Sequence, residues 1–213
     1  MSFLGGTLAR LRTPSLARRL VTLAVGWSLA SLLIVGVVLA LQFQRAALRS
    51  FDSNLSDQID NLLAGTTIEN GEVIAPALTD LKTLRAYSGR YWEIAEVGKD
   101  GRLRAIDGLT SRSLYDTELQ TPPDLAARLK AKPAKRIAYD AAGPQPGERV
   151  RVLAGWASFY GRAAPVVFLA AENRAPVDRE VRNFITATAV AFLLLGALLI
   201  GAVIIQVQVG LRP

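Results

Sequence analysis

Two long uncharged runs dominate the pattern of hydrophobic and polar positions along the chain. The first covers residues 20–44 and the second residues 183–211, and neither contains an Asp, Glu, Lys or Arg. A helix needs roughly 20 apolar residues to cross a hydrocarbon core about 30 Å thick. The pattern therefore predicts two transmembrane helices, at residues 20–44 and 183–209, on either side of a polar insert at residues 45–182.

The first part of the insert continues a helical pattern. Apolar side chains recur three and four positions apart, which predicts that the first helix extends beyond the membrane to about Gly65. The apolar face consists of Leu48, Phe51, Leu55, Ile59 and Leu62. This face either covers the sheet of its own domain or packs against the same helix of a second subunit.

The insert beyond Gly65 contains the short runs that are typical of β-strands. Asn70-Gly71 lies between two such runs and predicts a hairpin with a two-residue turn. The run "RYWEIAEV" predicts a half-buried strand whose Glu93 and Glu96 face solvent. The run "APVVFLAAE" is apolar almost throughout, which predicts a strand in the middle of a sheet.

Helix signals complete the insert. Residues 78–84 have helical spacing with Thr79 as the cap, and the segment from Pro123 to Lys130 predicts another short helix. Pro176 and Asp178 suit the first turn of a longer helix that runs into the second apolar run. The expected fold class is α+β, with two transmembrane helices flanking a domain built on an antiparallel sheet of about five strands.

Composition narrows the possible functions. The chain has no Cys and no His, which excludes disulfides, thiol chemistry, His-based acid–base catalysis and Cys or His metal sites within these 213 residues. No nucleophile motif or phosphate-binding loop is present either, so we expect no catalytic residue, no metal and no cofactor in this segment. No basic face interleaved with aromatic residues occurs, so we expect no nucleic-acid partner.

The distribution of charge predicts the orientation in the membrane. All 18 acidic residues lie in the insert. Four arginines precede the first apolar run: Arg10, Arg12, Arg18 and Arg19. Positive charge concentrates on the cytoplasmic side of membrane helices. We therefore expect a cytoplasmic tail at residues 1–19, a periplasmic insert and the start of a cytoplasmic linker at residues 210–213. The first run exceeds the apolar part of a cleaved signal peptide and lacks an Ala-x-Ala site after it, which favours an uncleaved anchor.

One cluster of polar and aromatic residues is a candidate ligand site. The segments "SGRYW" and "SRSLYD" flank the same predicted hairpin and could therefore meet. The candidate residues are Arg90, Tyr91, Trp92, Arg112, Ser113 and Tyr115. They could hold a small anion or carboxylate by forked hydrogen bonds, with Arg90 and Arg112 facing one polar cavity. The alternative is a folded loop in which an arginine pairs with Asp107 or Asp116 and the aromatic rings belong to the core.

Four segments carry a resemblance to a known family: "SGRYWEIA", "SRSLYD", "AAENRAPVDREVRNF" and "QVQVGLRP". In these segments, and in its layout over nearly its whole length, the chain resembles the N-terminal sensor half of bacterial transmembrane histidine kinases. The resemblance implies a PAS-like (PDC or PhoQ-type) periplasmic domain in a homodimer of the bacterial inner membrane. In that family a HAMP linker, a His-bearing dimerisation helix and an ATP-binding domain follow, and a response regulator is the partner.

The chain also departs from this family. It lacks the phosphoacceptor His, and it lacks the run of acidic residues found in magnesium-sensing members. Two other classes of protein are consistent with the same layout. One is the sensor of a chemoreceptor or of a cyclic-di-GMP enzyme, and the other is a two-span structural or assembly protein of the envelope. The codons after Pro213 would distinguish these classes, whereas the sequence itself does not name the ligand.

Overall fold

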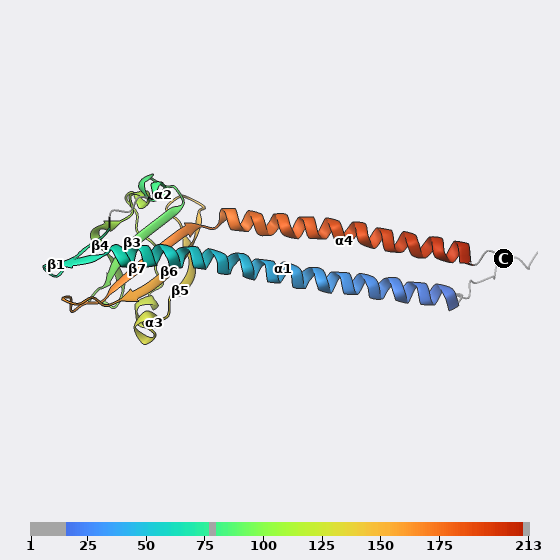
Figure 1. The fold of residues 1–213 in the computed structure, drawn as a ribbon, viewed down its shortest axis with the longest axis horizontal. Coiled ribbons are helices and arrows are strands. Elements are labelled where there is room, and N and C mark those ends of the chain that lie inside the picture. Colours follow the sequence, from blue (N-terminus) through green and yellow to red (C-terminus); the bar gives the residue numbers. More distant parts are fainter. Residues whose placement is uncertain (1–15, 77–79, 211–213) are drawn as a thin grey trace, which may run out of the picture. The chain divides into compact units, whose positions relative to one another are not determined.

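A computed structural model describes residues 16–76 and 80–210 (Figure 1). In chain order the elements are α1 (Leu16–Gly65), β1 (Thr67–Glu69), β2 (Glu72–Ile74), α2 (Leu81–Leu84), β3 (Arg90–Val97), β4 (Leu103–Thr110), the 3₁₀ helix η1 (Arg112–Leu114), α3 (Leu125–Ala131), β5 (Ile137–Ala142), β6 (Arg149–Ala157), β7 (Val166–Asn173) and α4 (Ala175–Gly210). The fold is therefore α+β, as the sequence pattern predicts.

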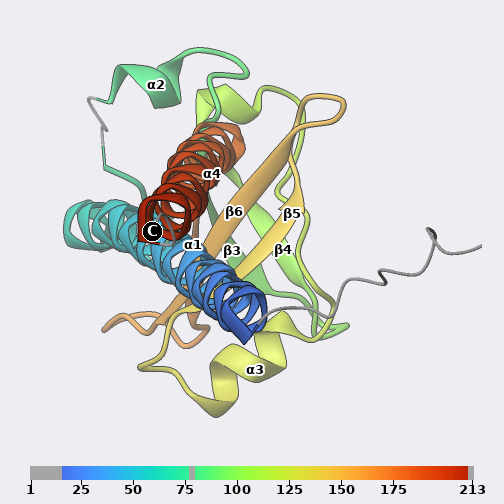
Figure 2. The same ribbon diagram turned by 90° about the vertical axis from the view of Figure 1, so that its right-hand side faces the viewer.

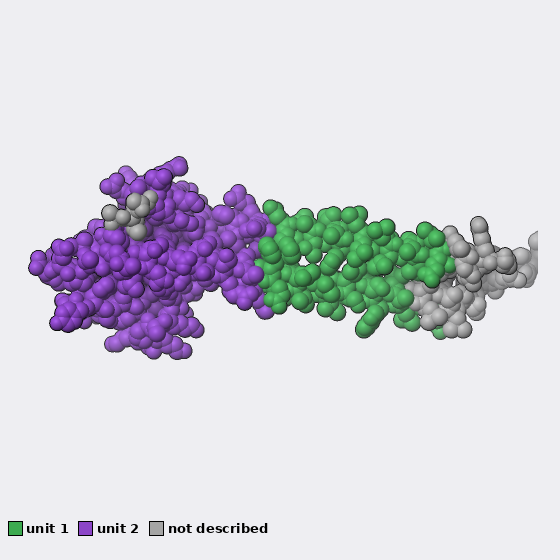
Figure 3. All heavy atoms as spheres, viewed as in Figure 1, with its two compact units in different colours: residues 1–43, 182–213 green, residues 44–181 purple. Residues whose placement is uncertain are grey.

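The chain divides into two compact units, which Figure 3 shows in different colours. One unit contains the described parts of residues 1–43 and 182–213, and the other contains residues 44–181. We call the second unit the insert domain. The helices α1 and α4 each contribute residues to both units.

A five-stranded antiparallel sheet forms the centre of the insert domain. Its strand order is β4-β3-β7-β6-β5, so that the apolar run in β7 occupies the middle position, as predicted. Both faces of β7 are covered, and Val166 to Ala171 are all buried. The predicted hairpin forms a separate two-stranded sheet of β1 and β2, in which Asn70 and Gly71 adopt positive φ angles of 52° and 82°. These angles are those of the type I′ turn that Asn-Gly favours.

The two faces of the sheet carry separate hydrophobic cores. On one face, Phe51, Leu55, Ile59 and Leu62 of α1 pack with residues of β3, β6 and β7, including Phe168. On the other face, Leu125 and Leu129 of α3 pack with inward residues of the same three strands. The short helices α2 and α3 lie at opposite margins of the domain in both ribbon views (Figure 1, Figure 2).

This packing decides between the two interpretations of the apolar face of α1. Leu55 and Leu62 are fully buried and Ile59 is 2% exposed, within a single copy of the chain. Phe51, Leu55, Ile59 and Leu62 therefore cover the sheet of their own domain, whereas Leu48, the residue of this face nearest the first apolar run, is only half-buried.

Two local predictions are wrong. The strand β3 lies between β4 and β7 and is buried on both faces, so Glu93 is only 2% exposed instead of facing solvent. Residues alternate in "RYWEIAEV" because the two faces of β3 contact two different hydrophobic cores, and not because one face is exposed to solvent. Residue Asp80 caps α2, since its carboxylate accepts a hydrogen bond from the backbone N–H of Lys82 at 2.9 Å. The predicted cap, Thr79, lies outside the described residues.

Both long helices are long and apolar enough to span a membrane. The most apolar 18-residue windows have a mean hydropathy of 2.4 within Thr22–Gly65 and 2.7 within Ala175–Gln206. Within the unit that these segments form, the rings of Phe43 and Phe184 stack at a centroid distance of 4.0 Å. A Cβ atom on Gly36 would lie 2.9 Å from the ring of Phe192, so a glycine at this position permits close approach of α1 and α4.

Candidate functional site

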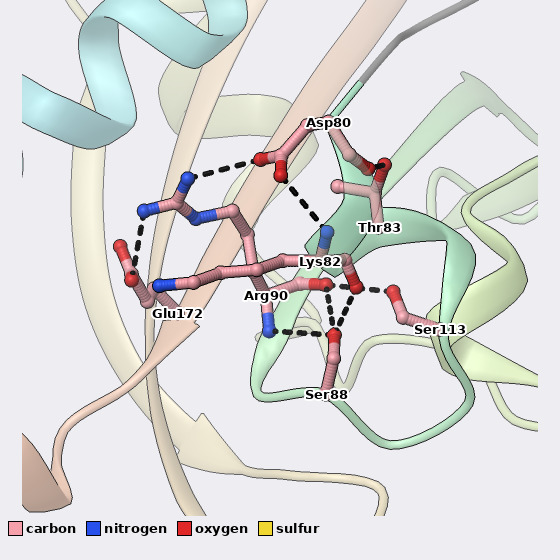
Figure 4. A network of polar contacts seen from close by, with 7 residues as sticks. All are labelled: Asp80, Lys82, Thr83, Ser88, Arg90, Ser113 and Glu172. Atoms are coloured by element: carbon pink, nitrogen blue, oxygen red, sulfur yellow. Dashed lines mark hydrogen bonds and ion pairs between the residues drawn. The ribbon is translucent and has the colours of Figure 1, made fainter.

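The candidate site of the sequence lies where β3 begins, beside α2 and η1 (Figure 4). Arg90 is the first residue of β3 and is paired in register with Glu172 of β7. Its guanidinium forms two ion pairs, one to Asp80 at 2.9 Å and one to Glu172 at 3.0 Å. Asp80, which caps α2, therefore also holds the guanidinium of Arg90 beside the start of β3.

Serine side chains hold the two predicted segments together. Ser113 of η1 donates a hydrogen bond to the backbone carbonyl of Arg90 at 2.6 Å. Ser111 accepts one from the backbone N–H of Trp92 at 3.0 Å, and the two serines bond to each other at 2.9 Å. The segments therefore do meet, as their positions beside one hairpin predict. Both serines are buried and fully engaged with the protein.

A polar cavity of about 430 Å³ lies between α1, α2 and β3. Its lining consists of Asn54, Asp57, Gln58, Asn61, Asp80, Thr83 and Arg90. The first four of these residues are spaced three or four positions apart and therefore share one face of α1. Amide and carboxylate groups dominate this lining, which suits a small polar ligand.

A second cavity of about 560 Å³ lies between the hairpin, α2 and β4, and we call it the apolar cavity. Trp92, Val73 and Leu109 give it an apolar lining, and Arg112 also contributes to it. Thr83 lines both cavities, and its hydroxyl donates to the backbone carbonyl of Asp80 at 2.8 Å. The short helix α2 therefore separates a polar from an apolar cavity.

The six predicted site residues take different positions around these cavities. Arg90 lines the polar cavity, whereas Trp92 and Arg112 line the apolar one, so the expectation of a shared cavity for the two arginines is not met. Tyr91 is buried on the opposite face of β3, and Tyr115 is 72% exposed. Arg90 already binds two carboxylates, and an anion would have to displace one of them to obtain a forked hydrogen bond.

The alternative expectation is also met only in part. Tyr91 and Trp92 do belong to the cores, but the arginine partners are not Asp107 and Asp116. Asp116 instead accepts a hydrogen bond from the hydroxyl of Tyr87 at 3.2 Å.

Electrostatics in this region favour the ionised form of Asp80. Burial raises the pKa of its carboxyl group, but the hydrogen bonds from Lys82 and Arg90 outweigh that effect, so the pKa lies below its ordinary value. Burial alone would lower the pKa of Arg90, but its two carboxylate partners raise it. Asp80 and Arg90 therefore form an ion pair in the wall of the polar cavity, and Glu172 holds Arg90 from the other side.

A buried carboxyl group lies on the other face of β3. Glu93 accepts a hydrogen bond from the backbone N–H of Leu119 at 2.9 Å. Burial raises the pKa of Glu93 to about 7, the Leu119 N–H opposes this shift, and nearby Glu118 adds to it. The hydroxyl of Tyr139 is buried without a hydrogen-bond partner among the described residues, and the charge of Glu93 acts on it. The insert domain thus contains a carboxyl group that changes charge near neutral pH.

A chain of alternating charges connects α1 to α4 within the insert domain. Arg151 of β6 binds Asp52 of α1 at 2.8 Å and Asp140 of β5 at 3.3 Å. Arg174, between β7 and α4, binds the same Asp140 at 2.6 Å and Asp178 of α4 at 3.1 Å. The two helices that enter the other unit are thereby linked through side chains of the sheet.

Sequence reasoning missed the polar face of α1 in the cavity and this chain of ion pairs. A signal for the first was present, because Asn54, Asp57, Gln58 and Asn61 recur at helical spacing. The second depends on contacts between residues as far apart as Asp52 and Arg151, which no local pattern reveals.

Comparison with known proteins found no matching family model, no matching curated protein and no matching solved structure. Among residues 16–76 and 80–210, no three His, Cys, Asp or Glu side chains form a group that could hold a metal ion. The function must therefore be inferred from the geometry and from the sequence pattern.

Proposed function

We propose that the chain is the input module of a transmembrane receptor, in which the insert domain detects a signal and α4 carries it to the other side of the membrane. The observation that carries this proposal is the direct connection of the central strand β7 to α4. β7 ends at Asn173 and α4 begins at Ala175, so Arg174 alone separates them. A change in the sheet would reach α4 without being lost in a flexible linker.

The junction is held by specific contacts. The side-chain oxygen of Asn173 accepts a hydrogen bond from the backbone N–H of Ala175 at 2.8 Å, which fixes the start of α4. Arg174 connects this start to Asp140 and Asp178. Both strands that pair with β7 contribute polar contacts near this junction. Arg90 of β3 binds Glu172 near the end of β7, and Arg151 of β6 binds Asp140, which also binds Arg174.

The unit outside the insert domain supports a membrane location. Leu23, Trp27, Leu33 and Leu193 are each at least 69% exposed, which is costly in water and favourable in lipid. We place both ends of the chain in the cytoplasm and the insert domain in the periplasm, because the arginines before the first span favour the inside. The corresponding location is the bacterial inner membrane.

We further propose that the receptor is a homodimeric two-component sensor histidine kinase with a PAS-like input domain. The segment "AAENRAPVDREVRNF", one of those that resemble this family, coincides with the end of β7 and the start of α4. A HAMP linker and a kinase domain would then receive the signal, and a response regulator would accept the phosphoryl group.

The polar cavity is the best candidate for the signal site. The carboxylates of Asp57 and Asp80 and the side-chain amides of Asn54 and Asn61 favour a small polar ligand that donates hydrogen bonds, such as an amine. Arg90 supplies a cavity wall, because its guanidinium is already occupied by two carboxylates.

A chimeric kinase tests the proposal. Residues 1–213 would be joined to the HAMP linker and kinase domain of a characterised sensor kinase, and autophosphorylation would be measured in membranes. Arg174→Gln, which disconnects α4 from Asp140, should change the basal activity at least severalfold. The matched control is Arg102→Gln, at an exposed residue of the β3–β4 turn, which should leave the activity unchanged.

The same chimera tests the ligand class. A panel of small amines, neutral amides and carboxylates would be applied to the wild type and to Asp57→Asn. We expect a response to an amine that Asp57→Asn weakens. If neither Arg174→Gln nor any member of the panel changes the activity of a chimera that inserts and folds, the chain is a structural membrane protein and not a receptor.

A further inference from the structure

A third cavity, of about 410 Å³, lies where α3 turns into β5. Four of its lining residues are cationic: Arg128, Lys132, Lys135 and Arg136. Ile137 and Ala138 of β5 contribute an apolar wall, and no carboxylate among the described residues lines the cavity. We call it the basic cavity. Its volume is in the range of pockets that hold small molecules.

The local fold brings these cations together and holds them there. Leu125 and Leu129 are fully buried and fix α3 against the sheet. The helix ends at Ala131, and the backbone N–H of Lys135 donates to the carbonyl of Lys132 at 3.0 Å, which closes a tight turn. Four cationic residues that line one cavity give it a positive potential, which favours an anion as its ligand.

The protein compensates only part of this charge. Arg136 is fixed to α1, where it binds the carboxylate of Asp60 and donates to the backbone carbonyl of Ser56 at 3.0 Å. Arg128 has only an exposed contact to Asp124 at 3.7 Å, which is a weak interaction. Lys132 and Lys135 form no ion pair with any described residue.

We propose that the basic cavity binds a soluble, multiply charged oxyanion of the oligophosphate class. Arg136 would contribute positive charge at one wall, while its Nη atoms stay bonded to Asp60 and Ser56 of α1. Lys132, Lys135 and Arg128 would close over the remaining oxygens of the anion, because their side chains are long and exposed. The concave shape and the apolar wall of Ile137 favour a discrete molecule over a flat anionic surface. This site is separate from the polar cavity and does not depend on the function proposed above.

Calorimetric titration tests the site. The full chain would be placed in nanodiscs of uncharged lipid and titrated with sodium tripolyphosphate at low and at physiological salt. The test variant is Lys132→Gln with Lys135→Gln. The matched control, Lys99→Gln with Arg102→Gln, removes the same charge from the exposed β3–β4 turn.

We expect saturable binding with one site per chain, weakened about tenfold or more by the test variant and unchanged by the control. Binding should also weaken as salt rises. Equal weakening of binding by both variants would show that binding depends only on the overall charge of the protein, which would overturn the site. Absence of saturable binding to the wild type would overturn it as well. So would binding only to vesicles that contain anionic lipid, because it would identify a membrane-docking surface instead.

Discussion

Arg151 of β6 and Asp52 of α1 form a two-point ion pair that joins the sheet to the first helix. The Nε atom of Arg151 lies 2.8 Å from Oδ1 of Asp52, and its Nη2 atom lies 2.9 Å from Oδ2. Both side chains are largely buried, with 18% and 30% exposed. A forked contact of this kind fixes direction as well as distance, since the guanidinium and the carboxylate must be coplanar.

Arg151→Gln should therefore destabilise the insert domain by about 1–3 kcal/mol, because it leaves Asp52 partly buried without its partner. Arg151→Lys should recover only part of the loss, since an ammonium group cannot reproduce the fork. Unfolding by urea, followed by tryptophan fluorescence, measures both. The control is Arg104→Gln, which removes an exposed pair to Asp100 and should leave the free energy of unfolding nearly unchanged. Equal losses in Arg151→Gln and the control would show that the forked pair contributes nothing.

Glu93 gives the insert domain a pH-dependent stability. Its pKa is raised from 4.5 to about 7 in the folded state, so the folded protein binds more protons than the unfolded chain between these values. The stabilisation is fully present below pH 4.5 and is lost as the pH rises to about 7. Glu93→Gln keeps the shape of the neutral side chain and removes the titration. It should raise the free energy of unfolding by on the order of 2–3 kcal/mol at pH 8.

The same variant should have nearly wild-type stability at pH 4, where both side chains are neutral. Urea unfolding at pH 4, 6 and 8 provides the comparison. A constant difference between Glu93→Gln and the wild type across this range would mean that Glu93 is not the titrating group.

The burial of the apolar face of α1 predicts a periodic pattern of thiol reactivity. The natural chain has no Cys, so single cysteines can be introduced without background. Leu55→Cys and Ile59→Cys should react slowly with a maleimide, because these side chains are buried between α1 and the sheet. Asn54→Cys and Asp57→Cys should react quickly, because they lie on the exposed side. Rapid crosslinking of Leu55→Cys between two copies would instead indicate that this face meets a partner.

The topology proposal predicts the sidedness of two further cysteines. Tyr160→Cys, at a fully exposed position of the insert domain, should react with a membrane-impermeant maleimide in intact spheroplasts. Arg19→Cys should react only after lysis. The reverse pattern would put the insert domain in the cytoplasm and would remove the basis for a periplasmic sensor.

Much of the fold follows from local patterns in the sequence. Asn70-Gly71 predicts its turn because both residues tolerate positive φ angles. The continuous apolar run of β7 predicts a strand that is covered on both faces. The exposed glutamate expected at position 93 shows where such reasoning stops. Alternation reports that two faces differ, but not whether the second face meets water or a second core.

The candidate site was harder to predict than the fold. The sequence correctly indicated that the segments around Arg90 and Ser113 meet, because both adjoin one hairpin. It did not indicate that Asp80 and Glu172 would occupy Arg90, nor that α2 would stand between Arg90 and Arg112. These outcomes depend on strand order and on competition among distant charges, and neither leaves a periodic trace in the chain.

The single-residue junction at Arg174 also sets the rotational phase of α4. An α-helix advances about 100° per residue, so one alanine inserted between Asn173 and Ala175 would turn every side chain of α4 by that angle relative to β7. Nearly four insertions would be needed before the original face returned. The length of this junction therefore determines which face of α4 each side chain occupies. A chimera made by exchanging domains at this point would have to keep the same number of residues.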